Sequence, residues 1–307
     1  MTSLRPKEFL RHAVLAIVGS TALAAAPVGG AHASTRHHAT VIKQITKTIR
    51  SVEVDSDSGA VTIATGTVTT VTADESWNNH RPALDINVRH GVLTIRSRCD
   101  APASFGHVNV DITSALNNCA DRLTLVVPED AAITAHTDGG RITSHGIHAA
   151  QQLRSGGGRV KVARAVGHLD ASTGGGGVVT RSVRGKQILH SGGGGIIARA
   201  AQGDIHATTG GSGIQIYDFM ARSIYAHAGG GAVTVIDRAK PQRLVATTGG
   251  GAVAVDVPSG VYAVTATSGS GRKHVSVSGV TVDQQAARTI TAHSGGGAVT
   301  VMGSTPG

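Results

Sequence analysis

Thr173-Gly-Gly-Gly-Gly-Val178 and Ser191-Gly-Gly-Gly-Gly-Ile196 are nearly the same sequence, and they begin 18 residues apart. Seven further segments share the pattern of a Ser, Thr or Ala followed by a glycine-containing run. They begin at Thr137, Ser155, Thr209, Ala228, Thr248, Ser268 and Ser294. The step is 18 residues from 137 to 155 and up to 209, then 19, 20 and 20, and finally 26. A repeat of this length is typical of a solenoid, in which each repeat forms one coil.

The residues around each glycine run alternate as they do in β-strands, where every second side chain shares a face. A large apolar residue stands four positions before the Ser, Thr or Ala in most repeats, and an Ala stands two positions before it. These pairs are Ile133/Ala135, Leu169/Ala171, Ile205/Ala207, Ile224/Ala226, Leu244/Ala246, Val264/Ala266 and Ile290/Ala292. After the glycines, a second set of alternating apolar residues follows. Its pairs are Val160/Val162, Ile214/Ile216, Val233/Val235, Val253/Val255 and Val299/Val301.

The pattern predicts an all-β fold, a single-chain β-solenoid of about nine glycine-rich coils over residues 131–302, with two short strands in each coil. Helices are disfavoured, because each glycine in a helix interior costs about 1 kcal/mol. Only 2% of the residues are aromatic, which suits a thin core of stacked layers. Residues 303–307 remain as a C-terminal tail.

Residues 41–130 alternate like strands but lack the repeat. We interpret them as an irregular N-terminal β-domain that merges into the solenoid and caps its first coil, with a separate sandwich as the alternative. Cys99 and Cys119, the two cysteines of the chain, fall in this region. In an oxidising compartment they are expected to form a disulfide, and two free thiols are the alternative.

Residues 1–33 have the features of a secretion signal: basic Arg5, Lys7 and Arg11, an apolar stretch from Ala13 to Ala26, and Ala31-His32-Ala33 as a cleavage site. Residues 34–40 would then form a linker. An uncleaved membrane anchor is the alternative, but the apolar stretch is short for a membrane span. The sequence therefore predicts a secreted or extracytoplasmic protein, cleaved near Ala33.

The chain carries 28 Lys and Arg against 19 Asp and Glu, which gives a formal charge of +9. An exported protein with this excess is attracted to anionic envelope polymers, lipid headgroups or acidic glycans. Dense basic runs and aromatic stacking residues are both lacking, so nucleic acid is not expected as a partner.

Three motifs resemble those of the bacterial DUF4097 family, whose members are called adhesins. Residues 57–61 (Asp-Ser-Gly-Ala-Val) match its opening Asp/Ser-Gly-x-Val, and residues 91–95 (Gly-Val-Leu-Thr-Ile) match its Gly-x-Leu-x-Ile strand. Residues 123–128 loosely match Leu-x-Val-x-Val-Pro, and the repeated Ser/Thr-Gly units follow in the family's order. The chain departs from the family in being richer in glycine runs. The resemblance covers most of the mature chain and implies a β-solenoid-like fold and an extracytoplasmic location.

Sites for metals and for catalysis are not predicted. Calcium-binding glycine repeats place an Asp in each turn, but the corresponding positions here hold Val179, Ile197, Gln215, Thr234 and Ala254. Residues 55–59 resemble half of a calcium loop and are interpreted as an ordinary Asx turn. The carboxylates of the repeats, at Asp170, Asp204, Asp218, Asp237 and Asp256, differ in their position within the repeat, so they do not form a glycosidase pair. We therefore predict no catalytic residues and no cofactor.

One column of side chains is unusual, because several repeats carry a basic residue directly before the Ser, Thr or Ala. Strand alternation places this column on the outside of the solenoid. Its members are His136, Arg154, His190, His227 and His293. Solvated surface residues are the plain interpretation, and a metal-binding or pH-responsive surface is the alternative.

The sequence favours a non-catalytic exported surface or scaffold protein, an adhesin that binds a partner or envelope polymer along its faces. A carbohydrate-active β-helix enzyme and an envelope signalling accessory are the alternatives. Weak self-association is also expected through the last coil, which carries Val299 and Val301, unless the insertion that includes residues 283–288 folds back over it.

Overall fold

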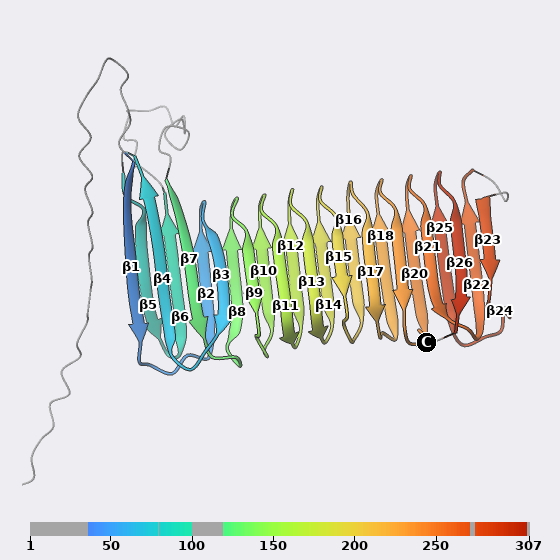
Figure 1. Cartoon of the computed structure of the whole chain (residues 1–307), viewed down its shortest axis with the longest axis horizontal. Helices are drawn as coiled ribbons and strands as arrows, with labels where there is room; N and C mark the ends of the chain where they lie inside the picture. The colour runs from blue at the N-terminus through green and yellow to red at the C-terminus, as the bar shows by residue number, and fades with distance from the viewer. Residues whose placement is uncertain (1–35, 79, 100–118, 271–273, 306–307) are drawn as a thin grey trace, which may run out of the picture.

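The computed structural model describes residues 36–78, 80–99, 119–270 and 274–305, and every named element among them is a β-strand (Figure 1). The secretion signal expected at residues 1–33 lies outside these ranges. The strands form two sheets of 13 strands each, which extend side by side along one long axis. The predicted β-solenoid is confirmed.

The first sheet contains the strands that follow the glycine runs. In spatial order these are β1 (His37–Ile45), β4 (Thr69–Trp77), β7 (Ala120–Val127), β3 (Ala60–Thr65), β9 (Ile142–His145), β11 (Val160–Val166), β13 (Val178–Arg184), β15 (Ile196–Arg199), β17 (Ile214–Phe219), β19 (Val233–Asp237), β21 (Val253–Pro258), β26 (Val299–Ser304) and β23 (Val275–Ser278).

The second sheet contains the strands that precede the glycine runs. In spatial order these are β24 (Thr281–Val282), β22 (Val261–Ser268), β25 (Thr289–Ser294), β20 (Arg243–Thr248), β18 (Ser223–Ala228), β16 (Ile205–Thr209), β14 (Gln187–Ser191), β12 (Leu169–Thr173), β10 (Gln151–Ser155), β8 (Ala132–Thr137), β2 (Ser51–Ser56), β6 (Val92–Arg98) and β5 (Ala83–Arg89).

Neighbouring coils stack in parallel and in register. Leu189 of β14 pairs with Ala207 of β16, and Ala207 pairs with Ala226 of β18, so the inward residues form continuous columns. These inward side chains are buried in one core cluster between the sheets. Each coil gains its stability from its neighbours, because the side chains of one coil alone cannot offset the entropy lost on ordering its backbone.

The hydroxyl group at the end of each second-sheet strand organises the glycine corner. The hydroxyl of Thr173 donates a hydrogen bond to the carbonyl oxygen of Gly158 in the preceding coil, at 2.7 Å. It also accepts one from the backbone N–H of Gly176, at 3.1 Å. A Cβ on Gly176 would lie 2.3 Å from the oxygen of Gly158, so the coils can stack at this corner only when the residue is glycine.

The two sheets continue without a break through the boundary that the sequence predicts between residues 130 and 131. Strand β2 pairs with β8 in parallel, with Ser56 opposite Thr137, and β3 pairs with β9. Strands β6 and β7 form the next coil outward, also in parallel. Only β1, β4 and β5 run antiparallel to their neighbours, and they cover the N-terminal end of the stack.

The C-terminal coils do not stack in chain order, which corrects the prediction that the coil bearing Val299 and Val301 is the last one. Strand β25 lies between β20 and β22, and β26 lies between β21 and β23. Val299 and Val301 are therefore fully buried. The segment of residues 261–282, which precedes this coil in the chain, forms the outermost layer instead.

Candidate binding surface

The predicted outward column lies on the exposed face of the second sheet. Its five basic residues are all exposed, and the register items place them in one line with Ser and Thr residues between them. The imidazole Nδ1 of His190 lies 2.8 Å from the hydroxyl of Thr208 in the next coil. The same pair recurs as His227 with Thr247.

The remaining members of this column have other contacts. His293 Nδ1 lies 2.8 Å from the hydroxyl of Thr267, while His136 Nε2 lies 3.1 Å from the Asp138 carboxylate. Arg154 lies 4.0 Å from Asp170. The column is thus a ladder of polar contacts between coils, and its histidines are separated by other residues. Among the described residues, no group of three or more His, Cys, Asp or Glu side chains is arranged to hold a metal ion.

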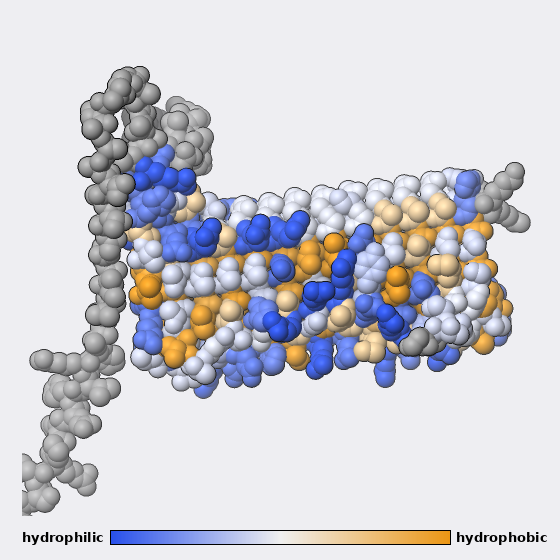
Figure 2. All heavy atoms as spheres, viewed as in Figure 1, coloured by the Kyte–Doolittle hydropathy of each residue, from blue (hydrophilic) through white to orange (hydrophobic). Residues whose placement is uncertain are grey.

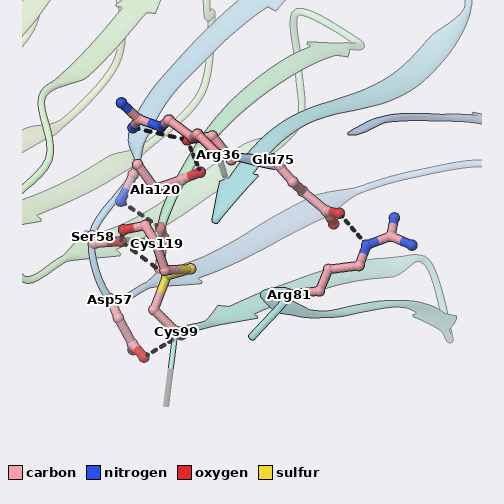
Figure 3. Close-up of a disulfide and its surroundings, with 11 residues drawn as sticks. Arg36, Asp57, Ser58, Glu75, Arg81, Cys99, Cys119 and Ala120 are labelled. Atoms are coloured by element: carbon pink, nitrogen blue, oxygen red, sulfur yellow. Dashed lines mark hydrogen bonds and ion pairs between the residues drawn. A yellow bond between two sulfur atoms is a disulfide. The ribbon is translucent and has the colours of Figure 1, made fainter. Parts of the chain in front are cut away.

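The expected disulfide between Cys99 and Cys119 is present, with a Cα–Cα distance of 5.8 Å (Figure 3). It joins the end of β6 to the start of β7, at the corner where other coils have a glycine run. The backbone N–H of Cys99 donates to the carboxylate of Asp57, at 3.1 Å. The bridge therefore holds together the two strands of this coil across the 100–118 segment.

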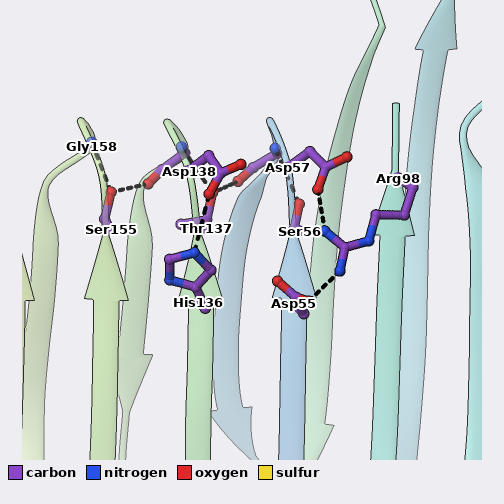
Figure 4. Close-up of polar contacts among 11 residues, drawn as sticks. Asp55, Ser56, Asp57, Arg98, His136, Thr137, Asp138, Ser155 and Gly158 are labelled. Carbon is purple, nitrogen blue, oxygen red and sulfur yellow. Dashed lines mark hydrogen bonds and ion pairs between the residues drawn. The ribbon is translucent and has the colours of Figure 1, made fainter. Parts of the chain in front are cut away.

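An ion-pair network that the sequence does not reveal lies beside the disulfide (Figure 4). The guanidinium of Arg98 contacts Asp55 at 2.5 Å and Asp57 at 2.6 Å. The hydrogen bond to Asp57 and the charge of Asp55 raise the pKa of Arg98. Asp55 and Asp57, which the sequence places in an Asx turn, thus serve to bind Arg98 of the neighbouring coil.

A buried carboxylate pair lies in the N-terminal coils, where β4 and β7 place Glu75 opposite Asp121. Glu75 contacts the guanidinium of Arg81 at 2.6 Å. Burial, the neighbouring Glu75 and then Asp57 raise the pKa of Asp121 to about 6. Both residues line a cavity of about 450 Å³.

The corner opposite the glycine runs carries a concentration of cations, which we call the basic corner: Arg164, Arg181, Arg184, Lys186, Arg199 and Arg222. All six are exposed. They lie where the chain leaves the first sheet and enters the second, in four consecutive coils. The sequence hides this surface, because its members stand at different positions within the repeat.

A backbone kink recurs at the basic corner. Arg164, Ser182, Ala200 and Asp218, spaced by 18 residues, have positive φ values of 50–54°. The kink breaks the strand alternation, so two successive side chains, such as Arg181 and Ser182, point outward before Val183 turns inward. A residue directly before the kink is outward-facing, and Arg181 pairs in register with Arg199 there.

Two grooves follow the basic corner. One holds about 330 Å³ and is lined by Arg164 and Arg184 together with His148. The other holds about 480 Å³ and is lined by Lys186, Arg222 and Lys240. Met220, which is exposed, lines the second groove as well.

The exposed faces carry rows of like side chains along the long axis. Figure 2 shows hydrophilic and hydrophobic rows on the visible face. Aromatic side chains take part on both sheets: His206 stacks on Tyr225 with ring centroids 4.4 Å apart, and the Arg199 guanidinium lies 5.3 Å from the Tyr217 ring. In the described part of the chain, no helix is long and apolar enough to cross a membrane.

Comparison with known proteins shows similarity in structure only. No family model and no curated protein matches the sequence. Among solved structures, a "putative cell adhesion protein" from Clostridium sporogenes is 10% identical, with 86% of this chain and 99% of that chain covered and a TM-score of 0.25. A "putative lipid binding protein" from Parabacteroides distasonis is 11% identical, with coverages of 85% and 96% and a TM-score of 0.43. A "putative adhesin" from Bacteroides fragilis is 12% identical, with coverages of 86% and 97% and a TM-score of 0.35.

Proposed function

We propose that this chain is an exported, non-catalytic surface scaffold of the adhesin type, which binds a partner molecule or an envelope polymer along the faces of its solenoid. The observation that carries the proposal is the repetition of outward side chains in register over the whole stack. Such columns present one chemistry many times along a straight line, which suits an extended ligand. The disulfide supports an oxidising, extracytoplasmic location.

A pull-down with residues 34–307 against purified envelope fractions tests this proposal. Retention of one polymer or protein fraction by the folded protein, and not by heat-unfolded protein, is the expected result. If the folded protein retains nothing from the envelope of the cells that produce it, the scaffold proposal is wrong.

The alternative of a carbohydrate-active enzyme is favoured by one observation, the Glu75–Asp121 pair beside its cavity. A glycosidase needs a carboxyl of raised pKa next to an ionised carboxylate, and Asp121 has the raised value. However, both side chains are buried, and Glu75 is already bound to Arg81. Release of reducing ends from polysaccharides by the purified protein, abolished by Asp121→Asn, would establish this alternative.

The third alternative, an envelope signalling accessory, differs from the scaffold proposal only in the identity of the partner. A signalling partner would be a protein with a single docking epitope, whereas an adhesin ligand would contact several coils. The same pull-down separates the two, because it identifies whether the retained molecule is a protein or a polymer.

A further inference from the structure

We propose that the basic corner binds a linear polyanion, a polymer whose repeating units carry phosphate or carboxylate groups, lying along the long axis of the stack. The inference rests on the proposed function, since it assigns a ligand class and a surface to the same scaffold.

The cations of the basic corner are not neutralised within the protein. Arg181 and Arg199 lie side by side on neighbouring parallel strands, an arrangement of like charges that is destabilising. Within the described residues, the side chains of Arg181, Arg184 and Lys186 make no ion pair and no hydrogen bond. Arg222 likewise has none. An external anion would relieve this repulsion, and guanidinium groups bind phosphate and carboxylate in bidentate fashion.

The carboxylates near the basic corner do not offset its charge. Asp218 binds Arg238 at 2.6 Å, and Asp204 accepts a hydrogen bond from the backbone N–H of Ser223 at 3.0 Å. Asp237 is buried, and this burial raises its pKa to about 7, so a large part of its population is neutral at physiological pH. The corner therefore stays positive along its length.

The distribution of the cations favours a polymer over a small anion. Coils stack at about 4.8 Å, so four consecutive coils spread the six cations over roughly 15 Å. A single phosphate would reach at most two of them. The two grooves beside the corner, lined by Arg164 and Arg184 on one side and Lys186 and Arg222 on the other, follow the same axis and give an extended chain a place to lie.

The test compares two double variants of the full chain without its predicted secretion signal. Arg181→Ser/Arg199→Ser removes two neighbouring cations from the basic corner. Arg141→Ser/Arg159→Ser removes two exposed cations from the glycine corner, where β9 and β11 begin in register. Both variants lose the same charge, so a difference between them reports position. Circular dichroism spectra and thermal melts check that both fold like the wild type.

Binding is measured with inorganic polyphosphate and with polygalacturonate, using neutral dextran and phosphatidylglycerol vesicles as further probes. The wild type should bind one or both acidic polymers, more weakly as salt rises. The basic-corner variant should bind about tenfold more weakly at low salt, and the glycine-corner variant should bind like the wild type. Polyphosphate alone, polygalacturonate alone or both would assign the ligand charge to phosphate, to carboxylate or to either group.

Equal losses in the two variants would show that only net charge matters, and would overturn the assignment to this corner. Binding to the vesicles without binding to either polymer would overturn the proposal in favour of a membrane surface, and binding to no anionic probe would overturn it outright. The scaffold proposal is judged separately: if the wild type and both variants retain the same envelope fraction in the pull-down, the basic-corner assignment fails while the scaffold proposal stands.

Discussion

At the residue scale, each glycine of a run has its own role, which the repeat alone does not distinguish. A Cβ on Gly176 would collide with the backbone of Gly158, at 2.3 Å. A Cβ on Gly175 would meet its nearest atom at 3.9 Å, an ordinary contact distance. Neither has a positive φ.

Gly176→Ala should therefore destabilise the protein by at least about 2 kcal/mol, because the two coils must separate at this corner. Gly175→Ala, its neighbour and matched control, should stabilise the protein by about 0.4–1 kcal/mol, because alanine reduces the entropy of the unfolded chain. Urea unfolding of both variants checks the pair, and similar losses would contradict the stacking described for this corner.

The inward Ala column and the outward His column predict opposite sensitivities. Ala207 is fully buried between Leu189 and Ala226, so Ala207→Leu should cost about 1–3 kcal/mol through overpacking. His190 is exposed, and His190→Ala should change the free energy of unfolding by less than about 0.5 kcal/mol. Denaturant melts that rank the two in reverse would show that the faces are assigned wrongly.

Asp237 should make stability depend on pH. Burial raises its pKa from 3.8 to about 7, and its Oδ2 has no hydrogen-bond partner. Between about pH 4 and pH 7 the native state holds the proton more tightly than the unfolded state, so the free energy of unfolding falls as pH rises. Asp237→Asn should remove this contribution, which we place at about 1–3 kcal/mol between pH 4 and pH 8.

Unfolding at pH 4, 6 and 8 measures the difference between the wild type and Asp237→Asn. Asp121, whose pKa is raised to about 6, is present in both proteins and therefore cancels in the comparison. A difference that does not change with pH would mean that Asp237 is ionised throughout this range.

At the element scale, the order of the last coils is the main departure from the sequence prediction. Inward residues of β22 (Val264, Ala266) match those of β25 (Ile290, Ala292), so either strand could pair with β20. The alternating pattern is equally satisfied by both orders. Strand β25 occupies the inner place, and the outermost coil comes from the segment before it.

Cysteine cross-linking distinguishes the two orders. Adjacent strands lie about 4.8 Å apart, within disulfide reach, whereas strands two places apart do not. Thr247→Cys/His293→Cys should form a disulfide without reduction, because these residues are paired in register. Thr247→Cys/Thr267→Cys should not, because His293 lies between them. Peptide mapping reads out both variants, and bonding of only the second pair would establish stacking in chain order.

At the scale of the whole molecule, a solenoid must protect its two ends, since an uncovered strand edge pairs with other chains. The N-terminal end is covered by the antiparallel strands β1, β4 and β5. The C-terminal end finishes in β23 and β24, which contain four and two residues. Strands this short leave little edge for another copy to pair with.

Weak self-association remains a prediction, and it now concerns the outer coil, where Val277 and Val282 are exposed. Sedimentation of residues 34–307 over a wide concentration range should show a small dimer fraction at the highest concentrations. Val277→Lys/Val282→Lys should abolish it, whereas Ile42→Lys at the opposite end should not. A monomer at every concentration would contradict the prediction.

The local pattern of the sequence determined the coil. Glycine runs at 18–20-residue spacing, with apolar residues at alternate positions, specify two strands, a tight corner and an inward face within each repeat. The partners Cys99 and Cys119 also followed from the sequence, because only two cysteines exist. These features depend on contacts between residues close in the chain, or between equivalent positions of successive repeats.

Tertiary structure alone decided how coils meet when several partners fit equally well. The inner place of β25, the continuation of the sheets through residues 51–127 and the gathering of cations such as Arg181 and Arg199 at one corner all depend on stacking. Each coil presents nearly the same edge to its neighbour, so hydrophobic alternation cannot specify which coil stacks on which. That choice is made by the length of the connections and by the close fit of backbones at the two corners.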